Sequence, residues 1–135
     1  MRLLQKTIIG VSLAVLAGCG GIAEQQTPEE RVADRAQERR MAMIDGDFEK
    51  AYEYLSPGYR ANTSLNAWKG RFGGAVNWTD AEVRSVECED DDACTATVLL
   101  SYRVSMPQGG DREGRRPFDE QWVRSEGEWW HLPRR

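Results

Sequence analysis

The feature that most constrains the fold is a change of hydrophobic periodicity in the middle of the chain. Apolar residues first recur at helical spacing, whereas from Thr79 onward β-branched residues and period-two alternation predominate. Helices followed by hairpin-linked strands predict an α+β domain, because hairpins make a sheet antiparallel. We therefore expect three N-terminal helices packed on an antiparallel sheet of about four strands.

The first helix is expected from its start and stop signals. Thr27 as N-cap, Pro28 at the first helical position and Glu30 as capping-box partner begin it, and Asp45 and Gly46 end it. The residues at helical spacing that we expect to face the core are Val32, Ala33, Ala36, Arg40, Met43 and Ile44.

Two shorter helices are expected next. Asp47 caps the second helix, which residues 56–58 end. Its apolar stripe consists of Phe48, Ala51, Tyr52 and Leu55. The third helix begins near residue 63 or 64 and ends at residues 73–74. It presents one apolar face made of Leu65, Trp68 and Phe72.

Alternation predicts strands at residues 81–88 and 94–106, joined by an acidic turn. The core-facing residues of the second strand are expected to be Ala96, Val98, Leu100, Tyr102 and Val104. Residues 107–117 contain three glycines and several charges, so we expect a loop there. A last hairpin is expected at residues 118–125 and 128–132.

The first residues form an export signal. Arg2 and Lys6 accompany an apolar run over residues 7–17, which is shorter than the about 20 residues that a transmembrane helix needs. Residues 16–19 resemble the lipobox of bacterial lipoproteins, in which the cysteine receives a diacylglyceryl group and becomes the first residue of the mature protein. A non-lipidated secretory signal is the alternative, and it would be expected to end in a small-x-small cleavage site.

The lipobox resemblance implies a signal peptide over residues 1–18 and a lipid anchor on Cys19. Residues 19–26 would then form the lipidated cysteine and its tether, and residues 27–135 the domain. Gly20 lacks the aspartate that resembles an inner-membrane retention signal. The periplasmic face of the outer membrane is therefore the expected location, with the membrane as a partner through the anchor.

Charge argues against two classes of partner. Removal of residues 1–18 takes away Arg2 and Lys6, which leaves 16 basic and 22 acidic side chains and a formal charge of −6. A net acidic chain without a basic stripe cannot neutralise phosphates, so we expect no nucleic-acid partner. An anionic lipid surface does not attract it either, so the acyl chains would do the anchoring.

Cys88 and Cys94 are an even pair in a chain with an export signal, and they flank the acidic turn. A disulfide between them is the simplest assignment in an oxidising compartment. It would fix the register of the hairpin that carries it.

The chain resembles the nuclear transport factor 2-like superfamily. The resemblance is carried by residues 45–52, 55–57 and 59–60, by the spacing to Trp68 and Phe72, and by residues 127–130. It implies a cone-shaped α+β fold over residues 28–132, in which helices fold over a curved antiparallel sheet. Members include isomerases, dehydratases, transport adaptors and secretion-system components, so the fold alone gives no function.

No catalytic or metal-binding set stands out. A cavity enzyme would need a carboxylate or histidine in the pocket, and the candidates are His131, Glu120 and Asp119, none of which we assign as catalytic. His131, the only histidine, alternates with Trp130, so one of the two faces the core. Residues 90–92 do not follow a calcium-loop spacing, and two exported cysteines favour a disulfide over zinc. We expect no metal or cofactor.

Aromatic side chains are the better indication of a binding site. Tyr and Trp are favoured where one end of a side chain is buried and the other meets a partner. The residues expected to line a pocket between helices and sheet are Tyr52, Tyr59, Trp68, Tyr102, Trp122 and Trp130.

These observations predict a non-catalytic, lipid-anchored binding or assembly module of the cell envelope, with an envelope protein as partner. The alternative is a carrier or cavity enzyme for a small apolar ligand, which a buried carboxylate facing the pocket would favour. A structural subunit of an envelope complex is the third class. It predicts an exposed apolar patch on the outer sheet face, to which Val123 or Trp129 would belong.

Overall fold

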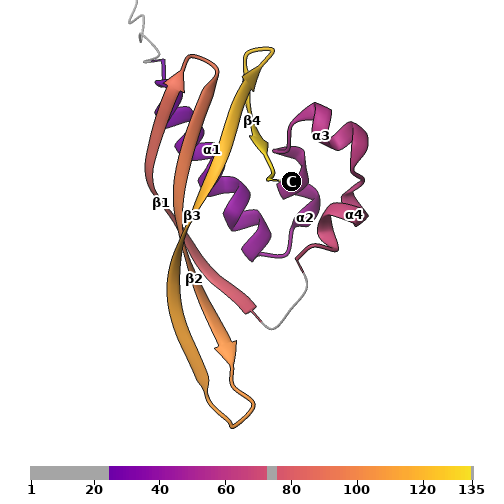
Figure 1. The fold of residues 1–135 in the computed structure, drawn as a ribbon, viewed down its shortest axis with the longest axis vertical. Helices are drawn as coiled ribbons and strands as arrows, with labels where there is room; N and C mark the ends of the chain where they lie inside the picture. Colours follow the sequence, from indigo (N-terminus) through magenta and orange to yellow (C-terminus); the bar gives the residue numbers. More distant parts are fainter. Residues whose placement is uncertain (1–24, 73–75, 135) are drawn as a thin grey trace, which may run out of the picture.

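The computed structural model describes residues 25–72 and 76–134, and its fold is α+β, as predicted (Figure 1). Its elements are α1 (Pro28–Ile44), α2 (Phe48–Glu53), α3 (Pro57–Asn62), α4 (Leu65–Lys69), β1 (Val76–Asp90), β2 (Ala93–Ser105), β3 (Asp111–Ser125) and β4 (Glu128–Leu132). The strands form one antiparallel sheet in the order β1-β2-β3-β4. The expected signal peptide, Cys19 and residues 20–24 of the expected tether lie outside the described residues. None of the described helices is long and apolar enough to cross a membrane.

α1 begins with the predicted capping box. Thr27 Oγ1 accepts a hydrogen bond from Glu30 N at 3.2 Å, and the Glu30 carboxylate accepts one from Thr27 N at 2.9 Å. The buried residues of the helix are Val32, Ala36, Arg39 and Ala42. Val32 and Ala36 confirm the predicted core face, but its buried arginine is Arg39, while Arg40 is only partly buried.

Residues 25–72 and 76–134 contain four helices where three were predicted. α2 ends at Glu53, before the predicted stop at residues 56–58. Residues 56–58 instead begin α3, because Ser56 Oγ accepts from Tyr59 N at 3.3 Å and Pro57 suits a first helical turn. α4 starts as predicted, with Ser64 as N-cap, but it ends at Lys69 rather than at residues 73–74. Backbone bonds between residues three apart then continue to Phe72, so tighter turns replace the predicted last helical turn.

The helices form two groups (Figure 1). α1 packs across one face of the sheet, on a core that includes Ala81, Ala96, Val98, Leu100 and Trp122. The second group, α2 to α4, lies beside β4. Together with Ala42 of α1 it forms the helical cluster, whose buried members are Ala42, Ala51, Leu55 and Trp68. Backbone bonds attach this group to β4, since His131 N donates to Tyr54 O at 2.8 Å and Ser56 N donates to His131 O at 3.0 Å.

The first hairpin is longer than predicted, because β1 and β2 pair from Val76↔Val104 to Asp90↔Ala93. The predicted core face of β2 is confirmed: Ala96, Val98 and Leu100 are buried, and Tyr102 and Val104 are half-buried. A disulfide joins Cys88 to Cys94 across the turn of this hairpin. The disulfide therefore closes a covalent loop that contains the acidic turn.

Most of residues 107–117 belong to β3, which corrects the predicted loop. β3 pairs with β2 from Asp111↔Ser105 to Val123↔Ala93. Polar cross-strand bonds support its charged half, since Ser105 Oγ donates to Asp111 at 2.9 Å and Arg103 donates to Glu113 at 2.6 Å. The chain turns only at residues 106–110, where both glycines adopt positive φ.

Gly114 is a packing position within β3 rather than a loop signal. A Cβ at this position would lie 2.5 Å from the hydroxyl oxygen of Tyr102 on the neighbouring strand. The absence of a side chain lets the Tyr102 ring lie across the strand. This glycine therefore has a structural role that its sequence context does not reveal.

Groups from the same chain partly cover both edges of the sheet. At β4, the covering groups are the backbone atoms of Tyr54 and Ser56. At β1, the Gln37 side-chain amide donates to Ala81 O at 2.7 Å and accepts from Val83 N at 3.2 Å. This amide occupies the position that a peptide group of a further strand would take.

Loss of the disulfide should destabilise the hairpin. Replacing both Cys88 and Cys94 by serine opens a loop whose ends are 6 residues apart in sequence. Chain-entropy arguments for so short a loop give a loss of about 2 kcal/mol in the free energy of unfolding, measured by urea titration. The wild-type protein after reduction is the matched control and should lose the same amount. An unchanged midpoint would contradict a stabilising role.

Candidate functional site

Successive side chains of β4 point to opposite sides of the strand, and they line two different clefts. Trp129 and His131 face the covered side of the sheet and are 4% and 7% exposed, whereas Trp130 and Leu132 point the other way. Trp129 is therefore the inward tryptophan of the pair. Trp130 and His131, although adjacent in sequence, line different clefts.

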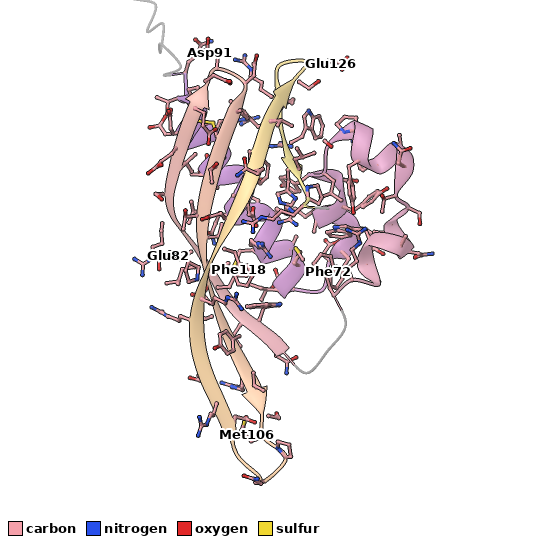
Figure 2. All side chains as sticks on the ribbon, in the orientation of Figure 1. Phe72, Glu82, Asp91, Met106, Phe118 and Glu126 are labelled. Atoms are coloured by element: carbon pink, nitrogen blue, oxygen red, sulfur yellow. A yellow bond between two sulfur atoms is a disulfide. The ribbon has the colours of Figure 1, made fainter. Side chains whose placement is uncertain are left out.

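The first cleft, here the inner cleft, has a volume of about 270 Å³ and lies between the sheet and the helical group. It is lined by Arg39, Arg40, Trp68, Arg71, Phe72, Phe118, Asp119, Glu120, His131, Pro133 and Arg134. Figure 2 shows Phe118 on the sheet and Phe72 on the facing helical group. Buried charged groups form the deep part of the cleft, and exposed Arg71 and Arg134 lie at its mouth.

A buried ion-pair cluster ties α1 to β3. Glu120 Oε1 accepts hydrogen bonds from Arg39 at 3.0 Å and from Arg40, and Oε2 accepts one from Trp122 Nε1 at 3.3 Å. The side chains of Arg39 and Glu120 are 3% and 1% exposed. Glu120 faces inward because it alternates in step with Phe118 and Trp122 along β3.

The charges of this cluster do not balance. Burial lowers the pKa of Arg39 to about 10; the charge of Glu120 opposes this shift, and that of Arg40 adds to it. Arg39 still carries its proton at neutral pH, so two positive charges share one carboxylate. In addition, Arg39 Nε is buried and has no hydrogen-bond partner among the described residues.

His131 presents a neutral imidazole beside the cluster. Burial, and then the positive charges of Arg39 and Arg40, hold its pKa well below 6.5. Its ring lies 5.6 Å from that of Trp122, centroid to centroid. Its Nδ1 atom is buried and unpaired within the part of the chain that the structure describes. The inner cleft thus contains an uncharged ring nitrogen with free hydrogen-bonding capacity.

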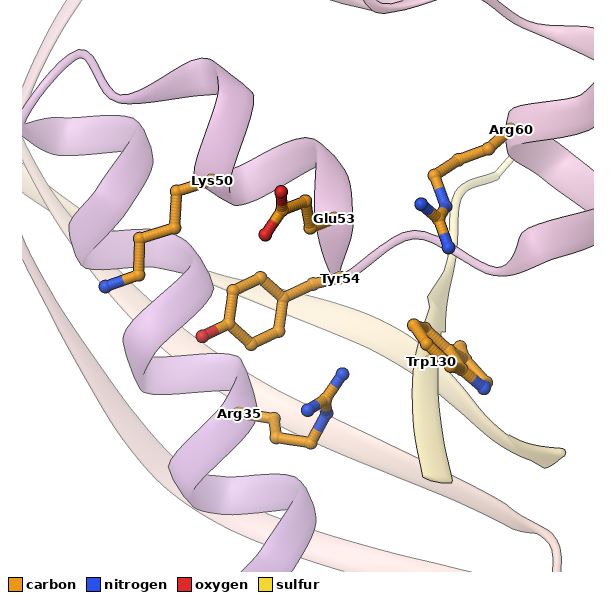
Figure 3. Close-up of a pocket in the computed structure, with 6 residues that line it drawn as sticks. All are labelled: Arg35, Lys50, Glu53, Tyr54, Arg60 and Trp130. Atoms are coloured by element: carbon orange, nitrogen blue, oxygen red, sulfur yellow. The ribbon is translucent and has the colours of Figure 1, made fainter. Parts of the chain in front are cut away.

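The second cleft, here the outer cleft, has a volume of about 430 Å³ (Figure 3). It is lined by Arg35, Lys50, Glu53, Tyr54, Arg60 and Trp130. The guanidinium carbons of Arg35 and Arg60 lie 5.4 and 5.6 Å from the centroid of the Trp130 ring. Two cations therefore contact one indole through cation–π interactions.

Arg35, Arg60 and Tyr54 of the outer cleft have hydrogen-bond partners within the protein. Arg35 Nε donates to a backbone carbonyl of β4 at 2.7 Å, and Arg60 Nε donates to Leu55 O at 3.1 Å. The Tyr54 hydroxyl donates to Glu38 at 2.6 Å. Burial, and then this hydrogen bond, raise the pKa of Tyr54 to about 12. Both arginines and the tyrosine of the outer cleft therefore already bond to protein groups.

The structure does not bring the predicted aromatic residues together in one pocket. Trp68 lines the inner cleft, Trp130 lines the outer cleft, and Trp122 is fully buried in the core. Tyr52 and Tyr59 pack in the helical cluster. Tyr102 contacts Trp78 edge to face, with 6.0 Å between the ring centroids.

The remaining acidic candidates lie on the outside. The Asp119 carboxylate accepts from Thr97 at 2.9 Å on the outer face of the sheet. In the exposed acidic turn, Asp90 accepts from Asp92 N at 2.8 Å. Among the described residues, no group of three or more histidine, cysteine or acidic side chains could hold a metal ion.

Arg39 and Arg40 are site residues that were not expected as such from the sequence. Arg39 follows Val32 by seven residues and Ala36 by three, so helical spacing places a charge on the apolar face. A charge in such a position requires a buried partner. The sequence signal for this buried ion pair was therefore twofold. It consisted of a charge on the apolar face of α1 and of Glu120 between two inward aromatic residues of β3.

No protein-family model matches the sequence, and no curated protein matches it. Among solved structures, the chain is similar to Aln2 from a Streptomyces species, with 18% sequence identity and a TM-score of 0.45 over 75% of this chain and 83% of that chain. A protein from Catenulispora acidiphila gives 16% identity and a TM-score of 0.48 over 75% and 83%.

Removal of the buried carboxylate should be strongly destabilising. Glu120→Gln leaves the guanidiniums of Arg39 and Arg40 without an opposing charge, and breaking a buried pair costs about 3–5 kcal/mol of unfolding free energy. Asp119→Asn, the neighbouring acid on the exposed face, is the matched control and should change stability by less than about 1 kcal/mol. Urea titrations of the three proteins measure both changes. Equal effects of the two substitutions would show that the buried cluster is not stabilising.

His131 should make stability fall in mild acid. The folded state disfavours the imidazolium, so below the ordinary pKa of 6.5 the unfolded chain binds more protons than the folded one. The free energy of unfolding should drop by about 1.4 kcal/mol between pH 7.5 and 5.5. The chain has one histidine, so His131→Gln should remove this dependence. A wild-type slope retained in the variant would assign the effect to other groups.

Proposed function

We propose that this chain is a non-catalytic, lipid-anchored binding module of the cell envelope that holds a small molecule in the inner cleft. The lipobox-like residues 16–19 support an anchor on Cys19 at the periplasmic face of the outer membrane. We also propose a nuclear transport factor 2-like domain over residues 27–135. The order of helices before an antiparallel sheet supports this assignment.

The observation that carries the proposal is the buried carboxylate of Glu120 at an open cleft with aromatic walls. Small-molecule sites are concave and largely apolar, with a few fixed polar groups. The inner cleft has both parts, because Trp68, Phe72 and Phe118 line it beside the charged cluster. Trp68 and Phe72 contact each other edge to face at 4.9 Å between centroids, which gives the wall a fixed shape.

The outer face of the sheet supports ligand binding over a structural-subunit role. Trp129 is buried and Val123 half-buried, so neither forms the exposed apolar patch that a subunit interface would use. The outer face carries polar cross-strand bonds instead, such as Thr97 to Asp119 at 2.9 Å and Thr95 to Glu89 at 2.8 Å.

The bonding of Glu120 supports binding rather than catalysis. A general base must accept a proton from a substrate, yet both oxygens of Glu120 already accept hydrogen bonds from protein groups. Asp119 turns its carboxylate to the outer face. These two acids are therefore poorly placed for proton transfer in the inner cleft.

His131 carries the alternative function. A neutral imidazole with an unpaired ring nitrogen, between two arginines and an aromatic wall, has the features of a base for a cavity enzyme such as an isomerase or dehydratase. Under that alternative, a molecule purified with the protein should be converted to a product by the wild-type protein. His131→Gln should abolish the conversion while retaining binding.

The binding proposal is tested on the lipidated protein extracted from membranes. Native mass spectrometry should detect a small molecule bound to the wild-type protein, and Phe72→Ala should reduce its occupancy about tenfold through lost apolar contact. Met106→Ala, at a similarly exposed apolar residue of the far hairpin, is the matched control. Cys19→Ala should move the protein from the membrane to the soluble fraction. A stoichiometric protein partner with an empty cleft would favour an assembly role instead.

A further inference from the structure

We infer that the ligand of the inner cleft carries a negative charge, most simply a carboxylate on an aromatic or alkyl body. This inference rests on the small-molecule binding proposed above and specifies its chemistry. It is carried by two observations: the excess positive charge of the buried cluster, and a buried donor that lacks an acceptor.

The charge excess follows from how the arginines are paired. Arg39 and Arg40 both donate to the same oxygen of Glu120, so one carboxylate serves two guanidiniums. The other acid at the cleft, Asp119, turns its carboxylate to Thr97 on the opposite face of the sheet. A net positive charge at 3% and 15% side-chain exposure is costly unless an anion accompanies it.

The unpaired donor provides a contact point for that anion. Arg39 donates through Nη1 to Glu120, while its buried Nε has no partner among the described residues. His131 lines the same cleft, and its Nδ1, also buried and unpaired there, can donate in the tautomer protonated at that atom. A carboxylate has two oxygens and can accept both bonds, and bonds to ionised partners are the strong ones.

The mouth of the cleft has the same sign of charge. Arg71 and Arg134 are exposed there, and Arg134 donates to the backbone oxygen of Asp119 at 3.0 Å, which holds it over the entrance. The whole chain has a formal charge of −4, so this cluster of arginines opposes the average charge of the molecule. Such a local field concentrates small anions at the entrance.

The outer cleft is cationic too, but it lacks these features. Arg35 and Arg60 flank the Trp130 ring and donate to backbone oxygens. In the described part of the chain, no buried polar atom that lines the outer cleft is unpaired. The anion is therefore assigned to the inner cleft.

The test uses two pairs of probes that differ only in charge: naphthalene-2-carboxylate with naphthalene-2-carboxamide, and benzoate with benzamide. Isothermal titration calorimetry on the folded protein, stripped of bound small molecules, should give at least tenfold tighter binding for the carboxylate of a pair.

Arg40→Gln leaves one arginine paired with Glu120, so the cluster becomes neutral. This variant should reduce the preference to less than threefold and change amide binding by less than twofold. Arg112→Gln, a charge removed far from the cleft on β3, is the matched control and should keep the preference.

The outcomes separate this inference from the proposed function. A carboxylate preference that Arg40→Gln removes supports the anionic ligand. Equal or tighter binding of the amides would overturn it and leave a small-molecule site intact. Absence of binding by all four probes at millimolar concentration, together with an empty cleft in the native protein, would overturn both. A preference that persists in Arg40→Gln would also overturn the inference, because the buried charge excess would not be its source.

Discussion

The ion pair between Arg39 and Glu120 is the interaction on which the arrangement of the molecule depends. Its partners are 81 residues apart in sequence, and it joins the middle of α1 to the inner face of β3. Removing two charges from water costs several kcal/mol per ion, so such a pair survives only where its geometry is well kept. The rotation of α1 on the sheet is thereby fixed. Arg40 then lies at the side of the cleft, and His131 stays uncharged beside both arginines.

The second determinant is β4, which is short but controls both clefts. A shift of one residue in its pairing with β3 would exchange the environments of His131 and Trp130. Its backbone also bonds to Tyr54 and Ser56, so the helical group is attached to the same strand. The register of β4 therefore also determines the position of the helical group. A ligand that changed either would change both clefts together.

Local signals explain which parts of this structure could be predicted from the sequence. The capping box of Thr27 and Glu30, and the alternation along β2, each act within a few residues, and both are found in the structure. The charged half of β3 has no such signal, because it is a strand only through its pairing with β2. The site is likewise non-local. A charge among the apolar residues of α1 and an acid between Phe118 and Trp122 become meaningful only once helix and sheet are stacked.

The Gln37 side chain bears on the tendency of many copies of the protein to aggregate. Exposed strand edges are templates on which neighbouring chains can add strands and aggregate. The Gln37 amide blocks part of the β1 edge, and the residues after α2 block part of the β4 edge. A lipid anchor would concentrate copies in a plane, where edge-to-edge contacts would be frequent. A side chain that occupies the edge hydrogen bonds would then favour a dispersed population over a fibrous one.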